Sequence, residues 1–258
     1  MRVRADLVWR GVVISVGMIL VAANVHAAAD APEAVKGVLV VTGQDYPGHK
    51  WQETAPVLAE ALRADTRLRV TVTEDPKSLA QDLSEYSAIV LHFMNWEQPD
   101  PGVEARANLE AFVKGGGGLV LVHFACGAFQ EWPEFRNLAG RVWDPQLRGH
   151  DPFGTFRVEI VDSEHPITKG IASFDTTDEL YTCLVGDRPI EILATAHSKV
   201  DDKDYPMAFV FEYGAGRVFH SPLGHDAPSL ANPPVAGLFR RGCAWAAGLA
   251  PDANASAH

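Results

Sequence analysis

The amino-acid sequence predicts an α/β protein with a mostly parallel sheet that is covered by helices on both faces. Apolar runs without internal polar residues recur along the first half of the chain, and segments with helical spacing lie between them. Unbroken apolar strands are typical of parallel sheets, because both of their faces are buried. The alternation of strand and helix indicates the same architecture, since parallel neighbours need a crossover connection.

The first half of the chain contains the expected parallel strands and two helices. Helical spacing covers residues 50–65 and 102–115, and the second helix is expected to stop at a glycine. The expected strands are residues 38–41, 67–75, 86–93 and 118–124.

After Trp132 the pattern changes to strands separated by Pro, Gly and Asp clusters. Residues 172–184 are expected to form a loop or a short helix, and a helix from about Pro234 to Ala247 closes the fold. No repeat or linker divides the chain, so residues 35–250 are expected to be one domain, followed by a disordered tail over 251–258. The expected strands of this half are residues 153–162, 190–197, 206–214 and 216–224.

Residues 1–27 have the pattern of a secretory signal peptide. Basic residues precede the segment 11–23, which is apolar apart from Ser15, and small residues precede Ala28. The apolar segment is shorter than the roughly 18 residues that span a bilayer. We therefore expect cleavage after Ala27, no stable membrane span afterwards, and a periplasmic or secreted protein.

The charge of the mature chain limits its partners. Removal of residues 1–27 takes away three Arg and one Asp, which leaves 19 basic and 32 acidic side chains and a formal charge of −13. Because an acidic surface without a basic stripe repels phosphate backbones, nucleic acid is not an expected partner. No nucleotide cofactor is expected, and the oligomeric state is left open. The three cysteines, Cys126, Cys183 and Cys243, are too few for a disulfide scaffold.

Histidines follow several of the expected strands. His49 lies in the loop after the first strand, His92 and His123 end two later ones, and His225 follows the last. A single histidine at such a place often hydrogen-bonds a carbonyl, but ligands of α/β sheets collect outside the carboxyl ends of the strands. We therefore expect these four histidines to converge on one rim of the sheet, and His49, His123, His225 and Glu179 to lie within about 10 Å of a common centre.

Two carboxylates, Asp178 and Glu179, are expected near these histidines. Histidines with carboxylates suit a zinc or manganese site, or a site of proton transfer. The spacing is not a compact motif such as HExxH, and the same carboxylates would also suit the first turn of a helix.

Tryptophans and a cysteine also lie beside the expected site. Trp51, Trp96, Trp132 and Trp143 could stack on sugar rings or pack in the core. Cys126 could be a nucleophile with His225 as its base, but the tight-turn pattern G-x-C-x-G is absent. A buried, unreactive cysteine is the favoured interpretation.

Several segments together resemble the ThuA-like proteins, which are named for trehalose utilisation. The resemblance runs from about Gly37 to Leu249 and includes GLVLVHFACGAF, WPEFRNLAGRVW, GHDPFGTFRVEI, HPITKGI, DELY, GRVFHSPLGHD and RRGCAWAAG. It implies a flavodoxin-like sheet, as in class I glutamine amidotransferases, and a role in bacterial sugar metabolism that is linked to 3-keto sugar derivatives. The Cys-His-Glu machinery of the amidotransferases is not implied, because the elbow pattern is missing. The positions that match the family's motifs are His49, His123, Trp132, Glu134, His150, Asp178, Glu179, Tyr181, His225 and Asp226.

The expected function is an enzyme that acts on a keto-glycoside or related carbohydrate by acid/base chemistry, with or without a divalent metal (Zn or Mn). Such an enzyme would be a lyase, a hydrolase or an isomerase. The alternatives are a Cys126/His225 hydrolase or amidase and a carbohydrate-binding protein without turnover. The residues expected in catalysis are His123, Glu179, Asp178 and Asp226. Those expected to contact the sugar are Trp51, Trp96, Trp132 and Tyr181. The expected metal ligands are His49, His150 and His225.

Overall fold

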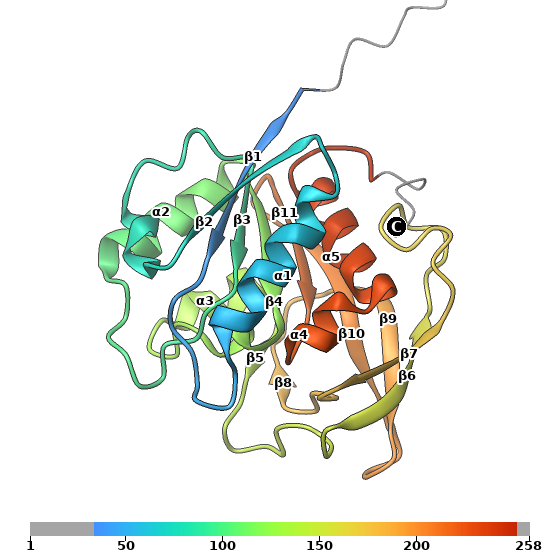
Figure 1. Ribbon diagram of the computed structural model, residues 1–258. Coiled ribbons are helices and arrows are strands. Elements are labelled where there is room, and N and C mark those ends of the chain that lie inside the picture. Colours follow the sequence, from blue (N-terminus) through green and yellow to red (C-terminus); the bar gives the residue numbers. More distant parts are fainter. Residues whose placement is uncertain (1–33, 252–258) are drawn as a thin grey trace, which may run out of the picture. The chain divides into compact units, whose positions relative to one another are not determined.

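In the computed structural model, residues 34–251 are described, and their central feature is a nine-stranded sheet (Figure 1). One half of the sheet consists of five parallel strands in the order β2-β1-β3-β4-β11. With β11 as the fifth parallel strand, this is the 2-1-3-4-5 order of flavodoxin-like folds. The predicted flavodoxin-like α/β fold is therefore confirmed. The strands are β1 (Lys36–Val41), β2 (Leu68–Thr73), β3 (Ala88–Leu91), β4 (Gly118–Val122) and β11 (Gly216–Ser221).

The other half of the sheet is antiparallel, so the sheet as a whole is mixed. It continues from β11 in the order β10-β9-β6-β7. A separate two-stranded sheet pairs β5 (Val142–Trp143) with β8 (Leu184–Val185). The antiparallel strands are β6 (Gly154–Ile160), β7 (Phe174–Asp178), β9 (Glu191–Ser198) and β10 (Lys203–Tyr213).

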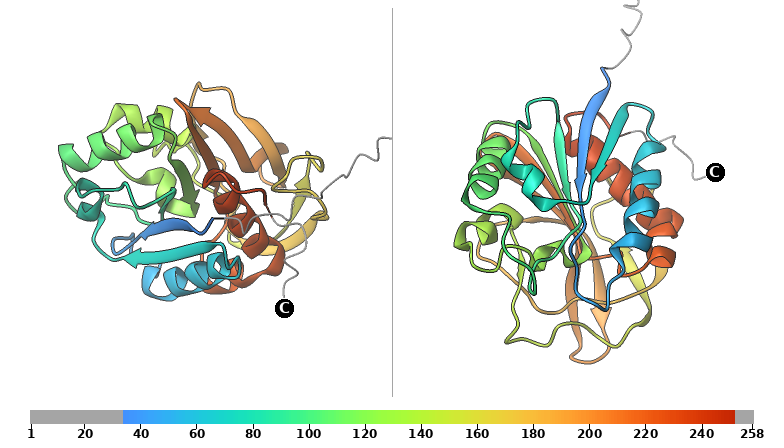
Figure 2. Two further views of the ribbon diagram at one scale, coloured as in Figure 1. Left: turned by 90° about the horizontal axis from the view of Figure 1, so that it is seen from above. Right: turned by 60° about the vertical axis from the view of Figure 1, so that its left-hand side comes forward.

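Helices cover both faces of the parallel half, as predicted (Figure 2). On one face lie α1 (Trp51–Arg63), α4 (Ala227–Ala231) and α5 (Pro233–Ala246), which contact one another. On the other face lie the 3₁₀ helix η1 (Pro76–Ala80), α2 (Val103–Lys114) and α3 (Pro133–Ala139). A second 3₁₀ helix, η2 (His123–Gly127), follows β4 directly.

The parallel strands divide their side chains between two cores. Val38 and Val40 of β1 pack with α1 and α5, whereas Leu39 and Val41 pack with η1 and α2. Successive side chains of a strand point to opposite faces, so a strand buried on both faces must be apolar at every position. This physical requirement produced the unbroken apolar runs from which the sheet was predicted.

The prediction for residues 172–184 was wrong. This segment contains the edge strand β7, in which Phe174, Thr176 and Asp178 are buried and the residues between them are exposed. The strand forms because its backbone pairs with β6, a contact between distant segments that the local sequence does not reveal. The short helices α3 and α4 were not predicted either, since one or two turns are too short to give a helical period.

The predicted signal peptide and residues 252–258 of the predicted tail lie outside the described residues. Within residues 34–251, no helix is both long enough and apolar enough to span a bilayer.

The turn that follows β1 depends on Gly43. Gly43 and Gly102 both have positive φ, at 102° and 111°. A Cβ on Gly43 would lie 1.7 Å from the carbonyl oxygen of Glu74, whereas a Cβ on Gly102 would meet nothing within 4 Å. We expect Gly102→Ala to cost about 1–3 kcal/mol of unfolding free energy through its backbone alone. Gly43→Ala should cost roughly 2 kcal/mol more, measured by urea denaturation. Equal costs for the two variants would mean that the turn after β1 relaxes freely.

Candidate metal centre

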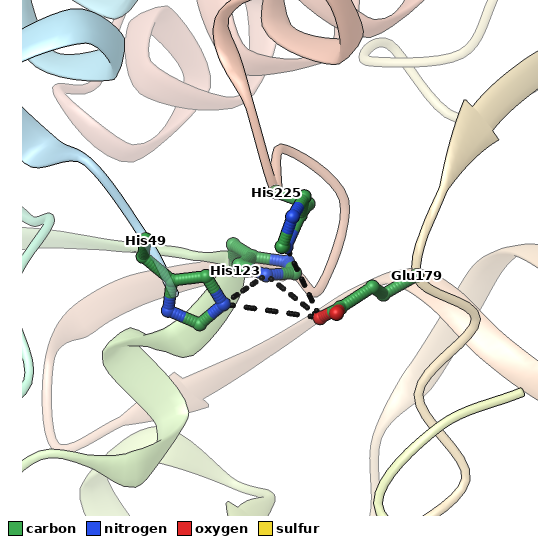
Figure 3. Close-up of side chains that lie close together, drawn as sticks. All are labelled: His49, His123, Glu179 and His225. Atoms are coloured by element: carbon green, nitrogen blue, oxygen red, sulfur yellow. Dashed lines mark hydrogen bonds and ion pairs between the residues drawn. The ribbon is translucent and has the colours of Figure 1, made fainter. Parts of the chain in front are cut away.

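Four polar side chains from distant segments meet at the carboxyl ends of the parallel strands (Figure 3). His49 lies between β1 and α1, His123 follows β4, His225 lies between β11 and α4, and Glu179 follows β7. One nitrogen or oxygen of each lies within 4.8 Å of the others. The predicted convergence of these four residues is confirmed, and we refer to them as the His3Glu cluster.

The spacing of the cluster suits a divalent metal ion. The Nε2 atoms of His49 and His123 are 3.3 Å apart. Glu179 Oε2 lies 3.2 Å from His225 Nδ1, 3.5 Å from His123 Nε2 and 3.8 Å from His49 Nε2. Tetrahedral zinc with bonds of about 2.0–2.1 Å separates its ligand atoms by about 3.3 Å. These four side chains could therefore hold a metal ion once their longer separations, which reach up to 4.8 Å, shorten.

His123 presents a lone pair to the cluster because its other nitrogen is occupied. The ring is fully buried, and Nδ1–H donates to the carbonyl oxygen of Pro222 over 2.7 Å. Nε2 is then unprotonated and accepts a hydrogen bond from the Tyr181 hydroxyl at 2.8 Å. Burial lowers the pKa of His123 to about 4, which keeps the imidazole neutral. His123 has a φ of 48°, a left-handed conformation that costs about 1–2 kcal/mol and turns the chain out of β4.

His49 is oriented by a carboxylate that the sequence analysis did not identify. Its Nδ1–H donates to Asp45 Oδ1 over 3.2 Å, so that Nε2 faces the cluster. A carboxylate behind a histidine is a common support for a metal ligand. Burial opposes the charged form of His49, but Asp45 and Glu179 outweigh it and raise the pKa to about 9. The spacing of four residues between Asp45 and His49 was the only signal in the sequence.

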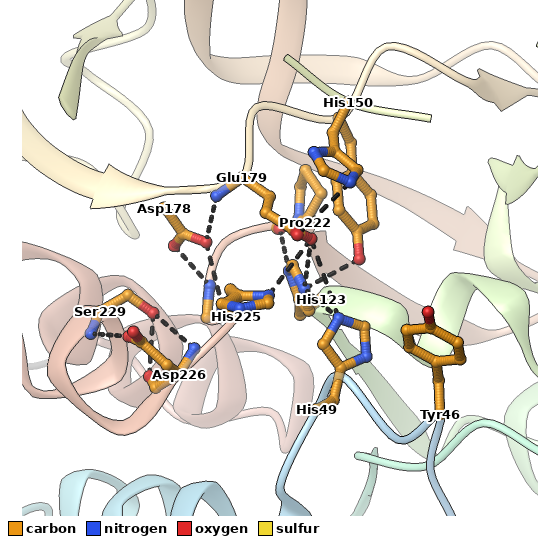
Figure 4. Close-up of polar contacts among 12 residues, drawn as sticks. Tyr46, His49, His123, His150, Asp178, Glu179, Pro222, His225, Asp226 and Ser229 are labelled. Carbon is orange, nitrogen blue, oxygen red and sulfur yellow. Dashed lines mark hydrogen bonds and ion pairs between the residues drawn. The ribbon is translucent and has the colours of Figure 1, made fainter. Parts of the chain in front are cut away.

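Asp178 fastens the loop of His225 to the end of β7 and has no ligand role in the cluster (Figure 4). Its buried carboxylate accepts the backbone N–H groups of Gly224 at 2.8 Å, His225 at 3.1 Å and Glu179 at 2.8 Å. Burial raises the pKa of Asp178 to about 6, against the lowering effect of these amides. Asp178 thus joins the edge strand β7 to the loop that follows β11.

Asp226 also has a structural role. Its carboxylate accepts the backbone N–H of Ser229 over 2.8 Å, and the Ser229 hydroxyl accepts the N–H of Asp226. This capping box begins α4, as N-terminal aspartates commonly do. Asp226, expected in catalysis, therefore lies beside the cluster and outside its donor set.

His150 lies at the edge of the cluster, although it was expected to be a ligand. Its Nε2 is 3.4 Å from Glu179 Oε1, the oxygen that faces away from the other histidines. Its Nδ1–H donates to the carbonyl oxygen of Asp151 over 2.6 Å, which leaves Nε2 directed at Glu179. Arg148 holds this segment through ion pairs with Asp151 and Asp201.

A pocket of about 240 Å³ opens over the cluster. Trp96, Trp143 and Tyr181 contribute to its walls. Trp51 lines a separate depression, and Trp132 lines a neighbouring groove, so neither faces this pocket. The pocket is lined by Tyr46, His49, Met94, Trp96, Phe124, Gly127, Trp143, His150, Glu179 and Tyr181.

Other candidates from the sequence lie elsewhere. His92 is buried outside the cluster, with its Nδ1 bonded to the Thr42 hydroxyl, and burial lowers its pKa to about 3. Glu134 accepts a hydrogen bond from the Tyr213 hydroxyl over 2.6 Å. Cys126 is 1 % exposed, and burial raises the pKa of its thiol well above the usual range. A protonated, inaccessible thiol is a poor nucleophile, which disfavours the hydrolase alternative.

Metal affinity should depend on pH through His49. Below pH 9 the metal-free imidazole carries a proton that a metal must displace, so binding releases one proton. We expect the zinc association constant to rise about tenfold per pH unit between pH 6 and 8, measured by competition with a chromophoric chelator. Asp45→Asn removes the carboxylate that raises this pKa and should flatten the dependence. A pH-independent affinity in the unaltered protein would contradict this assignment.

Solved structures with a similar fold include ThuA-like proteins. A ThuA-like protein from Parabacteroides merdae ATCC 43184 is 27% identical, with a TM-score of 0.73, and the match covers 84% of this chain and 92% of that one. A ThuA-like protein from Bacteroides uniformis ATCC 8492 shares the fold at 21% identity, with a TM-score of 0.66 and coverage of 84% and 93%. The fold also matches 32% of the β-galactosidase chain from Bacillus circulans sp. alkalophilus over 84% of this one, at 14% identity and a TM-score of 0.57.

No match was found among curated proteins. The family model ThuA, described as trehalose utilisation, matches residues 37–246, and the chain belongs to this family.

Proposed function

We propose that the protein is a metal-dependent enzyme that removes a proton next to the ketone of a keto-glycoside. The observation that carries this proposal is the His3Glu cluster, placed under a small pocket with aromatic walls and with His150 at its edge. The family's description, trehalose utilisation, supports a carbohydrate as the substrate. Zinc or manganese is the proposed ion, since imidazole and carboxylate ligands suit both.

The ligands of the ion would be His49, His123, Glu179 and His225. A bound divalent ion would act as a Lewis acid and stabilise the negative charge that develops on the ketone oxygen. With its Nε2 engaged in this way, His123 would no longer accept the hydrogen bond of Tyr181. The Tyr181 hydroxyl would then be able to donate to a substrate oxygen.

His150 is the residue to which we assign proton transfer. Its Nδ1–H is held by the Asp151 carbonyl, so the neutral ring has its lone pair on Nε2. A ketone acidifies the adjacent C–H bond, and Nε2 would accept that proton while the bonding electrons move toward the ketone oxygen. Return of this proton to the former ketone carbon, with transfer of the adjacent hydroxyl proton to the former ketone oxygen, would complete an isomerisation. In an elimination, the enolate electrons would re-form the ketone and a C=C bond as the C–O bond to the glycosidic oxygen breaks, and the departing oxygen would take the proton from His150. His123, the earlier candidate for this role, has neither nitrogen free for it.

Two substitutions separate metal binding from proton transfer. Glu179→Gln removes the charged ligand and should abolish both metal content and turnover. His150→Gln should retain the metal but slow turnover by about 10²–10⁴-fold, the range of a lost general base. Metal content is measured by mass spectrometry, and turnover by NMR detection of C–H exchange of 3-keto glycosides in D₂O. His197→Gln, on the exposed β9–β10 hairpin, is the matched control and should change neither.

Absence of metal and of C–H exchange in the unaltered protein would reject the proposed enzyme. Sugar binding without turnover would favour the carbohydrate-binding alternative instead.

We further propose that the mature protein works in the periplasm or outside the cell. The support is the basic, then apolar, then small-residue pattern of residues 1–27. N-terminal sequencing of protein from the producing cells should find Ala28 as the first residue. Membrane-bound protein that retains Met1 would indicate an anchor.

A further inference from the structure

The segment that carries His150 forms no helix or strand, so its position depends on contacts with other parts of the chain. This segment, residues 147–153, lies between β5 and β6, and we call it the His150 segment. Its backbone pairs with residues 180–182, the stretch that follows Glu179, through two hydrogen bonds of 2.9 Å. These bonds keep His150 close to Glu179, but they do not determine which nitrogen of the imidazole carries the proton.

Two acceptors compete for the proton of the neutral His150 ring. The carbonyl oxygen of Asp151 lies 2.6 Å from Nδ1, and Glu179 Oε1 lies 3.4 Å from Nε2 (Figure 4). Because a carboxylate accepts a hydrogen bond more strongly than a carbonyl does, the proton would move to Nε2 if the Asp151 carbonyl were displaced. The Nε2 lone pair that the proposed proton transfer needs therefore depends on where Asp151 holds its carbonyl.

A partly buried ion network holds Asp151 in place. The Asp151 side chain is 13 % exposed, pairs with Arg148 and accepts the Ser198 hydroxyl over 2.9 Å. The guanidinium of Arg148 also reaches Asp201 at 3.0 Å, and the Tyr205 hydroxyl donates to Asp201 over 2.6 Å. We call Arg148, Asp151, Ser198 and Asp201 the Arg148 network.

The Arg148 network ties the His150 segment to the β9–β10 hairpin. Ser198 ends β9, and Asp201 lies in the turn that follows it. The donors of a guanidinium form a fixed planar fork, so one arginine can hold two carboxylates at a set separation. A largely buried carboxylate that loses its cationic partner is costly to keep in place. Loss of Arg148 would therefore release the Asp151 side chain and the backbone carbonyl next to it.

We propose that Arg148 is a positioning residue, which sets the tautomer of His150 by holding the Asp151 carbonyl against Nδ1–H. The inference rests on the proton transfer proposed above and extends it to a residue that does not line the pocket. It also assigns the β9–β10 hairpin to the support of the site.

The tautomer of His150 is measured without turnover. Long-range ¹H–¹⁵N NMR correlations distinguish a protonated ring nitrogen from an unprotonated one, and the signals that disappear in His150→Gln identify this ring. At alkaline pH, where the neutral ring carries one proton, we expect that proton on Nδ1 in the unaltered protein. Arg148→Met should lower the ratio of the Nδ1–H form to the Nε2–H form about fivefold, the effect of one lost hydrogen bond.

Arg157→Met is the matched control. Arg157 on β6 also pairs with two carboxylates, those of Glu159 at 2.8 Å and Asp175 at 3.5 Å, and neither lies in the His150 segment. The same substitution there removes the same number of ion pairs, and it should leave the tautomer of His150 unchanged.

A milder variant keeps the test decisive if Arg148→Met does not fold. Asp201→Asn weakens only the outer ion pair of the Arg148 network, whose side chains are about one-third exposed. It should shift the tautomer ratio in the same direction by about twofold, the effect of a partly exposed ion pair.

Turnover provides a second measurement. Arg148→Met should lower kcat for C–H exchange by up to about fivefold with little change in KM, because the tautomer limits proton transfer and not binding. Arg148→Lys keeps one cation beside the carboxylates and should restore part of both the tautomer ratio and kcat.

An Nε2–H tautomer in the unaltered protein would overturn the inference. An unchanged ratio in both Arg148→Met and Asp201→Asn would do the same, and so would an equal shift in Arg157→Met. If the tautomer responds as expected and no C–H exchange occurs, the proposed reaction fails while the positioning of His150 by Arg148 stands.

Discussion

Electron-rich atoms of the four side chains in the His3Glu cluster crowd around one point, and the rest of the site is built to keep them there. His49, His123, His225 and Glu179 direct electron-rich atoms into a space in which all lie within 4.8 Å of one another. Such atoms repel unless a proton or a cation lies between them. In the metal-free protein the proton on His49 has this role: burial opposes its charge, but Asp45 and Glu179 outweigh burial and raise the pKa to about 9. A metal ion would replace that proton, and the cluster can therefore be viewed as a cation site.

The surrounding structure maintains this unfavourable arrangement. The Pro222 carbonyl and the Asp45 carboxylate each fix one imidazole by its rear nitrogen, and Asp178 fixes the loop of His225 through backbone amides. His123 has a left-handed backbone as well. Strained conformations persist only where the surroundings over-determine them, and they are common at functional sites. Burial of apolar side chains in the two cores on either side of the sheet offsets the free-energy cost of this strained, crowded arrangement.

The residues proposed to hold the metal and the residue proposed to transfer a proton lie in different parts of the site. The four residues of the His3Glu cluster lie at the floor, with His123 fully buried, while His150 is partly exposed and approaches Glu179 from the pocket side. Trp143 contacts Tyr181 and also forms the border between the pocket and the groove. The β5–β8 pairing carries Trp143 and with it this border.

The sequence by itself determined the parallel half of the sheet, because strands buried on both faces must be apolar throughout. It also determined that His49, His123 and His225 would meet, since loops after parallel strands share one edge. Glu179 was expected beside them, but only the tertiary structure shows how it comes there, since β7 lies at the far end of the sheet and Asp178 binds the amides of Gly224 and His225. The same holds for His150 and Trp132, whose places depend on how segments without regular structure fold over the sheet, and for Trp51, which begins α1 and lines a separate depression. The local sequence reveals which residues are buried and whether apolar residues repeat with the period of a helix or a strand. The direction of a side chain in a loop depends instead on contacts between residues that are distant in the sequence.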